Sequence, residues 1–147
     1  IVRTESLVTV AEEGRIRGRR VLVVEDGPSI THGSLPSGAG LAAAHRYGAA
    51  LAVDPRPWAV GSLAEIYNRY PHIGPVVPAM GYRPEQVAEL AATIDAVPCD
   101  LVLAATPIDL ASLVRVKTPI LRVGYTIAET NGTPLRDTFL HVLEERV

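Results

Sequence analysis

The chain has 147 residues, about the length of one domain, with 48% hydrophobic and 20% charged residues. This composition is typical of a folded globular protein and excludes a wholly disordered chain. The net charge of −2 provides no overall positive field for nucleic acid. The single cysteine, Cys99, excludes an intrachain disulfide framework, and no apolar run reaches the roughly 18 residues of a membrane span. We therefore expect a cytoplasmic protein with no nucleic-acid or membrane partner.

Apolar patterning in the first third of the chain predicts alternating elements. A helix-like pattern covers residues 5–13, and the apolar, β-branched run 21–24 is typical of a buried strand of a parallel sheet. Residues 27–40 contain four glycines and two prolines, which predict a long, sharply turning loop. A small-residue helix over 39–47 and a second buried strand over 49–53 follow.

The same alternation continues to the end of the sequence. Helices are predicted over 62–70, 84–97, 110–113 and 135–143, and strands over 101–105 and 120–125. Residues 76–81 are predicted to form a short strand or an extended loop. Ser62 and Glu65 predict a capping box at the start of the first of these helices. Apolar strands separated by helices predict a three-layer α/β fold, with a mostly parallel sheet covered by helices on both faces.

Polar residues follow three of the predicted strands, at the edge where parallel sheets bind ligands. They are Glu25 and Asp26 after 21–24, Asp54 and Arg56 after 49–53, and Thr106 and Asp109 after 101–105. Because the carboxyl ends of parallel strands lie at one edge, we expect these side chains to share one binding site. Arg122 and Tyr125 lie on a strand that we expect to be central, where a buried ion pair competes with any ligand role.

A series of motifs, in order along the chain, resembles one protein family. The motifs are VLVVEDGP at 21–28, THG at 31–33, GAG at 38–40, VDPRP at 53–57, YPHIGP at 70–75, PAMGY at 78–82 and TPID at 106–109. They resemble segments of cyclic 2,3-diphosphoglycerate synthetase and the predicted GTPases related to it, over most of residues 19–125. The resemblance implies that residues 1–147 are a single α/β domain, or the C-terminal portion of a larger domain similar to P-loop NTPases.

The resemblance also implies a function. The best-known member of the family uses ATP to close a phosphoanhydride ring within 2,3-bisphosphoglycerate, which implies an NTP-dependent phosphoryl-transfer or ligase-type enzyme. The implied cofactors are Mg²⁺ with ATP or GTP. The implied partners are a small anionic phosphorylated substrate, the N-terminal portion of the same protein and a second copy in a homo-oligomer. No GxxxxGK[ST] loop precedes Lys117, the one lysine of the sequence, so we expect the chain by itself to be inactive.

The candidate metal and phosphate residues each have a second, structural interpretation. Glu25 and Asp26 can hold Mg²⁺, directly or through water, or they can meet solvent and cap the next turn. Thr31, His32 and Gly33 can present N–H groups and an imidazole to phosphate oxygens, or they can form an ordinary turn.

The remaining candidates are open to two interpretations as well. Gly38 and Gly40, like Gly33, allow a positive φ or a close backbone approach, and the helix start at 38–40 also favours an anion. Arg56 can grip an anionic substrate or form a local pair with Asp54. Thr106 and Asp109 lie where G-domain proteins read the base, but Asp109 can instead cap the helix 110–113.

Two other function classes remain open from the residues alone. The first is a non-catalytic module that binds a nucleotide or a partner protein. The second is a flavodoxin-like or Rossmann-like binder, although the chain lacks the GxGxxG turn with a following acid. Cys99 precedes a predicted strand among apolar neighbours and is interpreted as an inert core thiol.

Overall fold

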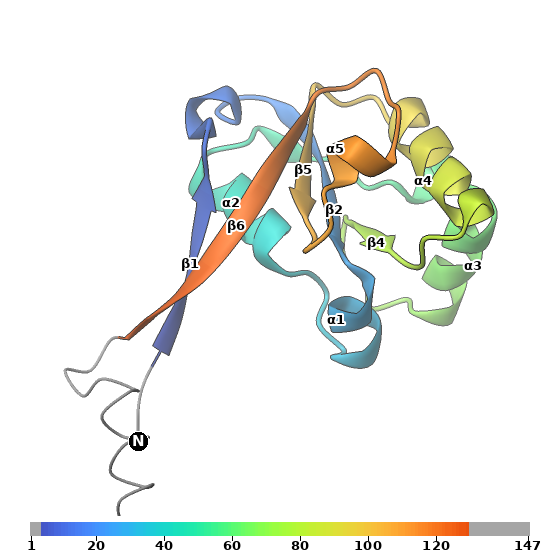
Figure 1. Ribbon diagram of the computed structural model, residues 1–147, viewed down its shortest axis with the longest axis horizontal. Coiled ribbons are helices and arrows are strands. Elements are labelled where there is room, and N and C mark those ends of the chain that lie inside the picture. The colour runs from blue at the N-terminus through green and yellow to red at the C-terminus, as the bar shows by residue number, and fades with distance from the viewer. Residues whose placement is uncertain (1–3, 130–147) are drawn as a thin grey trace, which may run out of the picture.

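The computed structural model describes residues 4–129, and the helix predicted over 135–143 lies outside these residues. The described part is an α/β fold around a six-stranded, mostly parallel sheet (Figure 1). The strands are β1 (Thr4–Val10), β2 (Arg20–Asp26), β3 (Leu51–Ala52), β4 (Val77–Ala79), β5 (Leu101–Ala105) and β6 (Ile120–Glu129). Their order is β1-β6-β5-β2-β3, with β4 also paired to β2. The predicted fold class is therefore confirmed.

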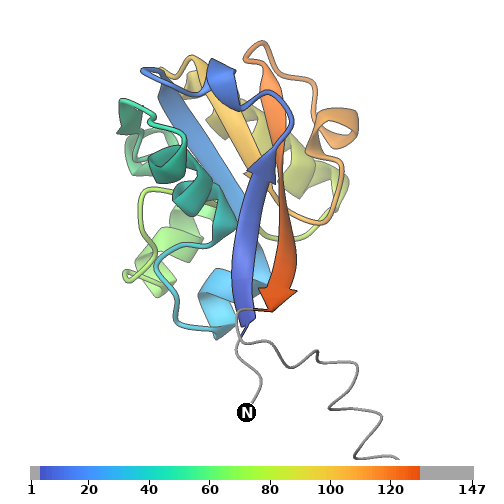
Figure 2. The ribbon, with the colours of Figure 1, turned by 90° about the vertical axis from the view of Figure 1, so that its left-hand side faces the viewer.

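Helices cover both faces of this sheet. They are α1 (Gly27–His32), α2 (Ala39–Arg46), α3 (Ser62–Arg69), α4 (Pro84–Ala96) and α5 (Leu110–Leu113), with short 3₁₀ turns η1 (Glu13–Arg15) and η2 (Arg56–Trp58). Figure 2 shows α2 and α5 on opposite sides of the central strands. No helix in the described part of the chain is long and apolar enough to cross a membrane.

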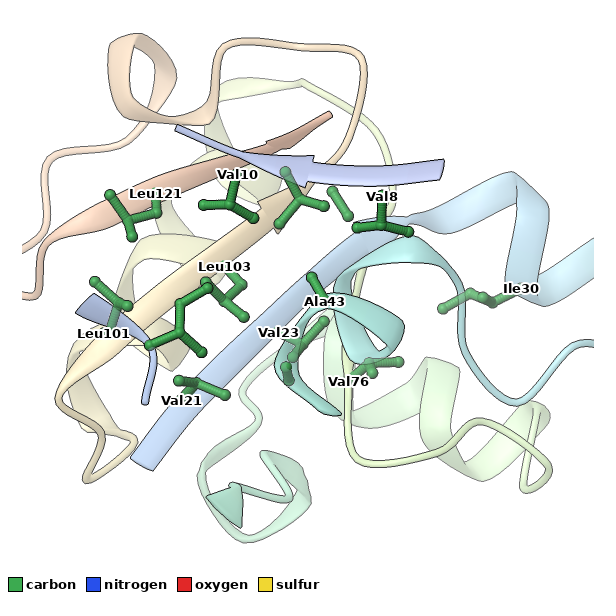
Figure 3. Close-up of a cluster of buried hydrophobic side chains, with 14 of the residues drawn as sticks. Val8, Val10, Val21, Val23, Ile30, Ala43, Val76, Leu101, Leu103 and Leu121 are labelled. Carbon is green, nitrogen blue, oxygen red and sulfur yellow. The ribbon is translucent and has the colours of Figure 1, made fainter. Parts of the chain in front are cut away.

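Alternation along β2 divides the core into two clusters. Val21 and Val23 face α2 and pack with its buried alanines, Ala43 and Ala44 (Figure 3). Leu22 and Val24 belong to the second cluster, with buried residues of α4 and α5. Because both faces of β2 are buried, its sequence is a continuous apolar run rather than an alternating one. The two charged residues at its end are therefore held on a rigid central strand.

The predicted helix over 5–13 is wrong, because residues 4–10 form the edge strand β1 and a turn follows them. β1 pairs antiparallel with β6 from Thr4↔Glu129 to Val10↔Val123. Val8 and Val10 are buried while Thr9 is exposed, which is the two-residue period of a strand. The short apolar run is compatible with the period of a helix and with that of a strand, and pairing with β6 makes it a strand.

Three local predictions are also corrected by the structure. Residues 27–40 are not all loop, because α1 begins at Gly27 with Pro28 in its first turn, where proline is tolerated. The strand at 49–53 is short and lies at an edge, with Leu51 53% exposed. Ser62 does not cap α3 from outside: it is the first helical residue, and its N–H and hydroxyl donate to the Glu89 carboxylate of α4.

The strand register along β2 decides which loops reach its carboxyl end. β3 pairs with the beginning of β2, at Arg20 and Val21. β4 takes over the same edge and pairs with the last residues of β2, Val24↔Val77 to Asp26↔Ala79. The loop after β3 therefore leaves the sheet before the level of Glu25, and β4 lies beside Glu25 and Asp26 instead.

Candidate functional site

A pocket of about 550 Å³ lies at the carboxyl end of β2. Its lining comes from six elements and the loops between them: Val8, Glu25, Asp26, Ser29, Ile30, Leu35, Gly38, Ala39, Ala42, Ala105, Pro107 and Tyr125. Val8 and Ile30 also belong to the core cluster and lie toward this end of β2 in Figure 3. The pocket is thus open space at the edge where parallel sheets bind ligands.

Glu25 joins β2 to the start of α2. Its Oε1 accepts hydrogen bonds from the N–H groups of Gly38 at 2.9 Å and Leu41 at 3.0 Å. These are among the N–H groups that a helix leaves without an internal partner, so the carboxylate occupies the anion position at the α2 N-terminus. The N–H groups of Gly38 and Leu41, at the helix start expected to favour an anion, therefore already donate to a side chain of the protein itself.

Burial raises the pKa of Glu25 above 4.5, because the side chain is only 2% exposed and the charged form loses its water. The backbone N–H groups of Leu41, Gly38 and Gly40 lower the pKa, and the nearby Asp26 charge raises it further. Burial is the largest of these effects. Glu25 is thus a carboxyl group whose charge is costly without a partner in the pocket.

The Glu25→Gln variant should show this cost in the pH dependence of stability. The folded state of the natural chain binds a proton more tightly than the unfolded state, so its free energy of unfolding falls as pH rises above 4.5. The slope from one group is at most about 1.4 kcal/mol per pH unit. Urea unfolding across pH 4 to 8 should show this fall relative to Glu25→Gln, and parallel curves would contradict the raised pKa.

The glycines near Glu25 are needed for close approach rather than for positive φ. A Cβ on Gly38 would lie 2.8 Å from Oε2 of Glu25. A Cβ on Gly40 would lie 2.6 Å from a Val23 methyl and 3.0 Å from Ala105 Cβ. Gly33 is similar, because a Cβ there would lie 2.4 Å from the Ser29 carbonyl oxygen. None of the three has a positive φ, so the close-approach interpretation is the one observed.

Asp26 lines the same pocket and is partly exposed. Its Oδ2 accepts a hydrogen bond of 2.9 Å from the Ser29 hydroxyl in the first turn of α1. Thr31, inside α1, donates to the Gly27 carbonyl at 2.9 Å and lies 3.1 Å from Nδ1 of the exposed His32. Thr31 and His32 are therefore helical and lie outside the pocket lining.

Arg56 forms a local pair with Asp54, which was one of the two roles predicted for it. Its Nη1 donates to both carboxylate oxygens of Asp54, at 3.0 and 2.9 Å, and its Nη2 donates to the Ile73 carbonyl. The guanidinium carbon lies 5.1 Å from the centre of the Tyr67 ring. Arg56 and Asp54 do not line the pocket, because β4 separates the loop after β3 from the end of β2.

Thr106 and Asp109 follow β5, close to the pocket but not in its lining. Asp109 caps α5 by accepting from the Ser112 N–H at 3.4 Å and the Ser112 hydroxyl at 2.6 Å. The bond from that hydroxyl is the main cause of its lowered pKa. Thr106 is buried, and its Oγ1 accepts from the Ile108 N–H. Their geometry is thus that of a capped turn.

Tyr125 lines the pocket, although it was expected on a central strand where a buried ion pair competes with a ligand role. β6 lies next to the edge strand β1, so Tyr125 is 62% exposed and Arg122 is exposed as well, not buried in an ion pair. The spacing of Leu121, Val123 and Tyr125 could have placed this ring on the α2 face of the sheet, because alternate residues of a strand share a face.

The carboxylates of Glu25 and Asp26 could hold Mg²⁺ together with a bound ligand, but they do not form a complete metal site by themselves. Among residues 4–129 no three histidine, cysteine or acidic side chains gather as a metal site. Mg²⁺ keeps several waters and is commonly bound through one or two carboxylates plus substrate phosphates. Asp26, partly exposed, suits that role better than Glu25, whose Oε1 is already engaged.

The fold and the pocket define an α/β domain with paired carboxylates at the strand ends. No protein-family model matches the chain, and no solved structure matches it. It is 43% identical over 145 residues to arginine synthetase ArcE of Thermococcus kodakarensis. The alignment covers 99% of this chain and 32% of that protein, so the chain spans about a third of the length of the curated relative. The chain is therefore similar to part of an arginine synthetase, while its resemblance to cyclic 2,3-diphosphoglycerate synthetase stays a prediction.

Proposed function

We propose that this chain forms the nucleotide- and Mg²⁺-facing edge of an NTP-dependent ligase-type enzyme that makes arginine. The observation that carries the proposal is the 43% identity to arginine synthetase along 99% of the chain. The pocket at the carboxyl end of β2 adds a place for the reaction, because ligands of parallel α/β sheets bind at that edge. The phosphate-binding loop would come from residues outside this chain.

Within this proposal Asp26 contacts the metal of a bound Mg²⁺–nucleotide. Mg²⁺ would neutralise charge on the phosphates during transfer, and Asp26 at the rigid end of β2 would fix the position of that metal. Glu25 fixes α2 against β2 and so shapes the same pocket. The residues that follow β2 and β5 in the sequence remain candidates for nucleotide contact; they are Thr31, His32, Gly33, Thr106 and Asp109.

Titration calorimetry on the full-length protein tests this proposal directly. ATP or GTP should bind in the presence of Mg²⁺ and bind much more weakly after chelation with EDTA. Asp26→Asn should weaken Mg²⁺-dependent binding by about 10- to 100-fold, because it removes the negative charge and one metal-binding oxygen. Comparing ATP with GTP in the same experiment identifies the base.

The matched control is Asp100→Asn, the same chemical change at the opposite end of the sheet. Asp100 accepts hydrogen bonds from Arg20 at the beginning of β2, far along the strand from Asp26. Its substitution should leave nucleotide affinity unchanged. Equal effects of the two variants on nucleotide affinity would show that Asp26 does not contact the metal. Failure of the full-length protein to bind either nucleotide would overturn the enzyme proposal and favour a non-catalytic module.

The anionic phosphorylated substrate predicted from the sequence receives less support from the pocket. Among the described residues that line it, none is lysine or arginine, and two are acidic. Arg56, the predicted anion-binding residue, is held by Asp54 and the Ile73 carbonyl. An anionic acceptor would therefore need the bound Mg²⁺, or cations from residues beyond those described.

A further inference from the structure

The pocket has one acidic end and otherwise apolar walls. Seven of its lining residues are alanine, valine, isoleucine, leucine or proline, and Tyr125 lies among them. The acidic end consists of Glu25 and Asp26, at the end of β2. Such a pocket suits a molecule with an apolar stem and a cationic or hydrogen-bond-donating tip.

Glu25 keeps one oxygen free for such a tip. Its Oε1 accepts the two bonds from α2, whereas Oε2 accepts none from a described residue. No fully buried side-chain oxygen or nitrogen in the described part of the chain lacks a partner. Oε2 therefore reaches solvent through the pocket that Glu25 lines, although the side chain as a whole is only 2% exposed. Oε2 is therefore the Glu25 oxygen that can accept a hydrogen bond from a ligand in the pocket.

Tyr125 supplies a flat aromatic surface in the same pocket. Its side chain is 62% exposed, and the ring has no stacking partner among the described residues. A guanidinium is planar, stacks on aromatic faces and donates to carboxylates in a fork, unlike a compact ammonium group. An acidic oxygen together with an open ring therefore favours a guanidinium over a simple ammonium.

We propose that this pocket binds the side chain of arginine, with the guanidinium between Glu25 Oε2 and the Tyr125 ring and the methylene stem along the apolar wall. The inference rests on the proposed function and names the place of its amino-acid product. Asp26, the more exposed of the two carboxylates, is left for the metal of the nucleotide. The reacting group of the amino acid would thus lie beside the phosphates, as transfer between them requires.

Titration of the full-length protein with L-arginine tests the assignment. L-Arginine should bind, L-lysine should bind at least about tenfold more weakly, and L-norleucine, which has the stem without the cation, should bind more weakly still. Glu25→Gln should weaken L-arginine about tenfold or more, because charge-assisted hydrogen bonds are lost while the bonds to α2 can persist. Tyr125→Ala should weaken it about three- to tenfold, and Tyr125→Phe should restore the affinity because the ring is kept.

The nucleotide titration separates this inference from the proposed function. Glu25→Gln and Tyr125→Ala should weaken L-arginine binding by a larger factor than Mg²⁺–nucleotide binding. Normal nucleotide binding together with equal affinities for L-arginine and L-norleucine, or with no effect of both variants on L-arginine, would overturn the arginine pocket alone. If the unmodified full-length protein binds neither ATP nor GTP, the proposed function is overturned instead.

Discussion

Gly40→Ala should lower the free energy of unfolding by about 2 kcal/mol, within the range for overpacked cores. The new Cβ would lie 2.6 Å from a Val23 methyl, 3.0 Å from Ala105 Cβ and 3.2 Å from Glu25 Oε1. These atoms belong to the sheet and cannot move without disturbing its pairing. α2 must therefore shift outward, which lengthens the two hydrogen bonds to Glu25 and changes the shape of the pocket.

A double-mutant cycle with Val23→Ala tests the physical reason. Removing the Val23 methyl groups gives the new Cβ space, so Gly40→Ala should cost about 1 kcal/mol less in the Val23→Ala background. Gly14→Ala is the matched control, because a Cβ there meets no atom within 4 Å and should change stability by less than about 0.5 kcal/mol. Strict additivity in urea unfolding would show that the clash is not between residues 23 and 40.

Leu103→Ala should lower the free energy of unfolding by about 3 kcal/mol, the usual cost of a large-to-small change in a rigid core. Leu103 is fully buried in the middle of β5 and packs in the cluster beneath α2. β5 pairs along β2 as far as Glu25↔Ala105, so a cavity there weakens the support of the acidic strand end. Chemical denaturation should report the loss as a lower midpoint with an unchanged slope.

Leu51→Ala makes the same chemical change on the surface. Leu51 is 53% exposed on the two-residue strand β3, so its truncation should change stability by less than about 0.5 kcal/mol. Similar losses for the Leu51 and Leu103 variants would contradict the placement of β5 at the centre of the sheet and β3 at its edge.

The carboxylate pair of the site was predictable from local sequence. An apolar, β-branched run followed by Glu25 and Asp26 indicates a buried strand that ends in charge, and the parallel order of the sheet puts such ends at the ligand edge. Gly38 and Gly40 were predictable as positions that need either a positive φ or a close approach, and the structure shows the close approach. Their partner was not predictable, because the contact with Glu25 joins segments more than ten residues apart.

The sequence alone determined the α/β class, because strands buried on both faces must be apolar throughout and helices must cover them. Only the tertiary structure decided which strand ends meet. The register places β4, not β3, beside the end of β2, so Arg56 pairs with Asp54 away from the pocket. Pairing with β6 likewise made residues 4–10 a strand and left the Tyr125 ring open, since partners distant in sequence decide both outcomes.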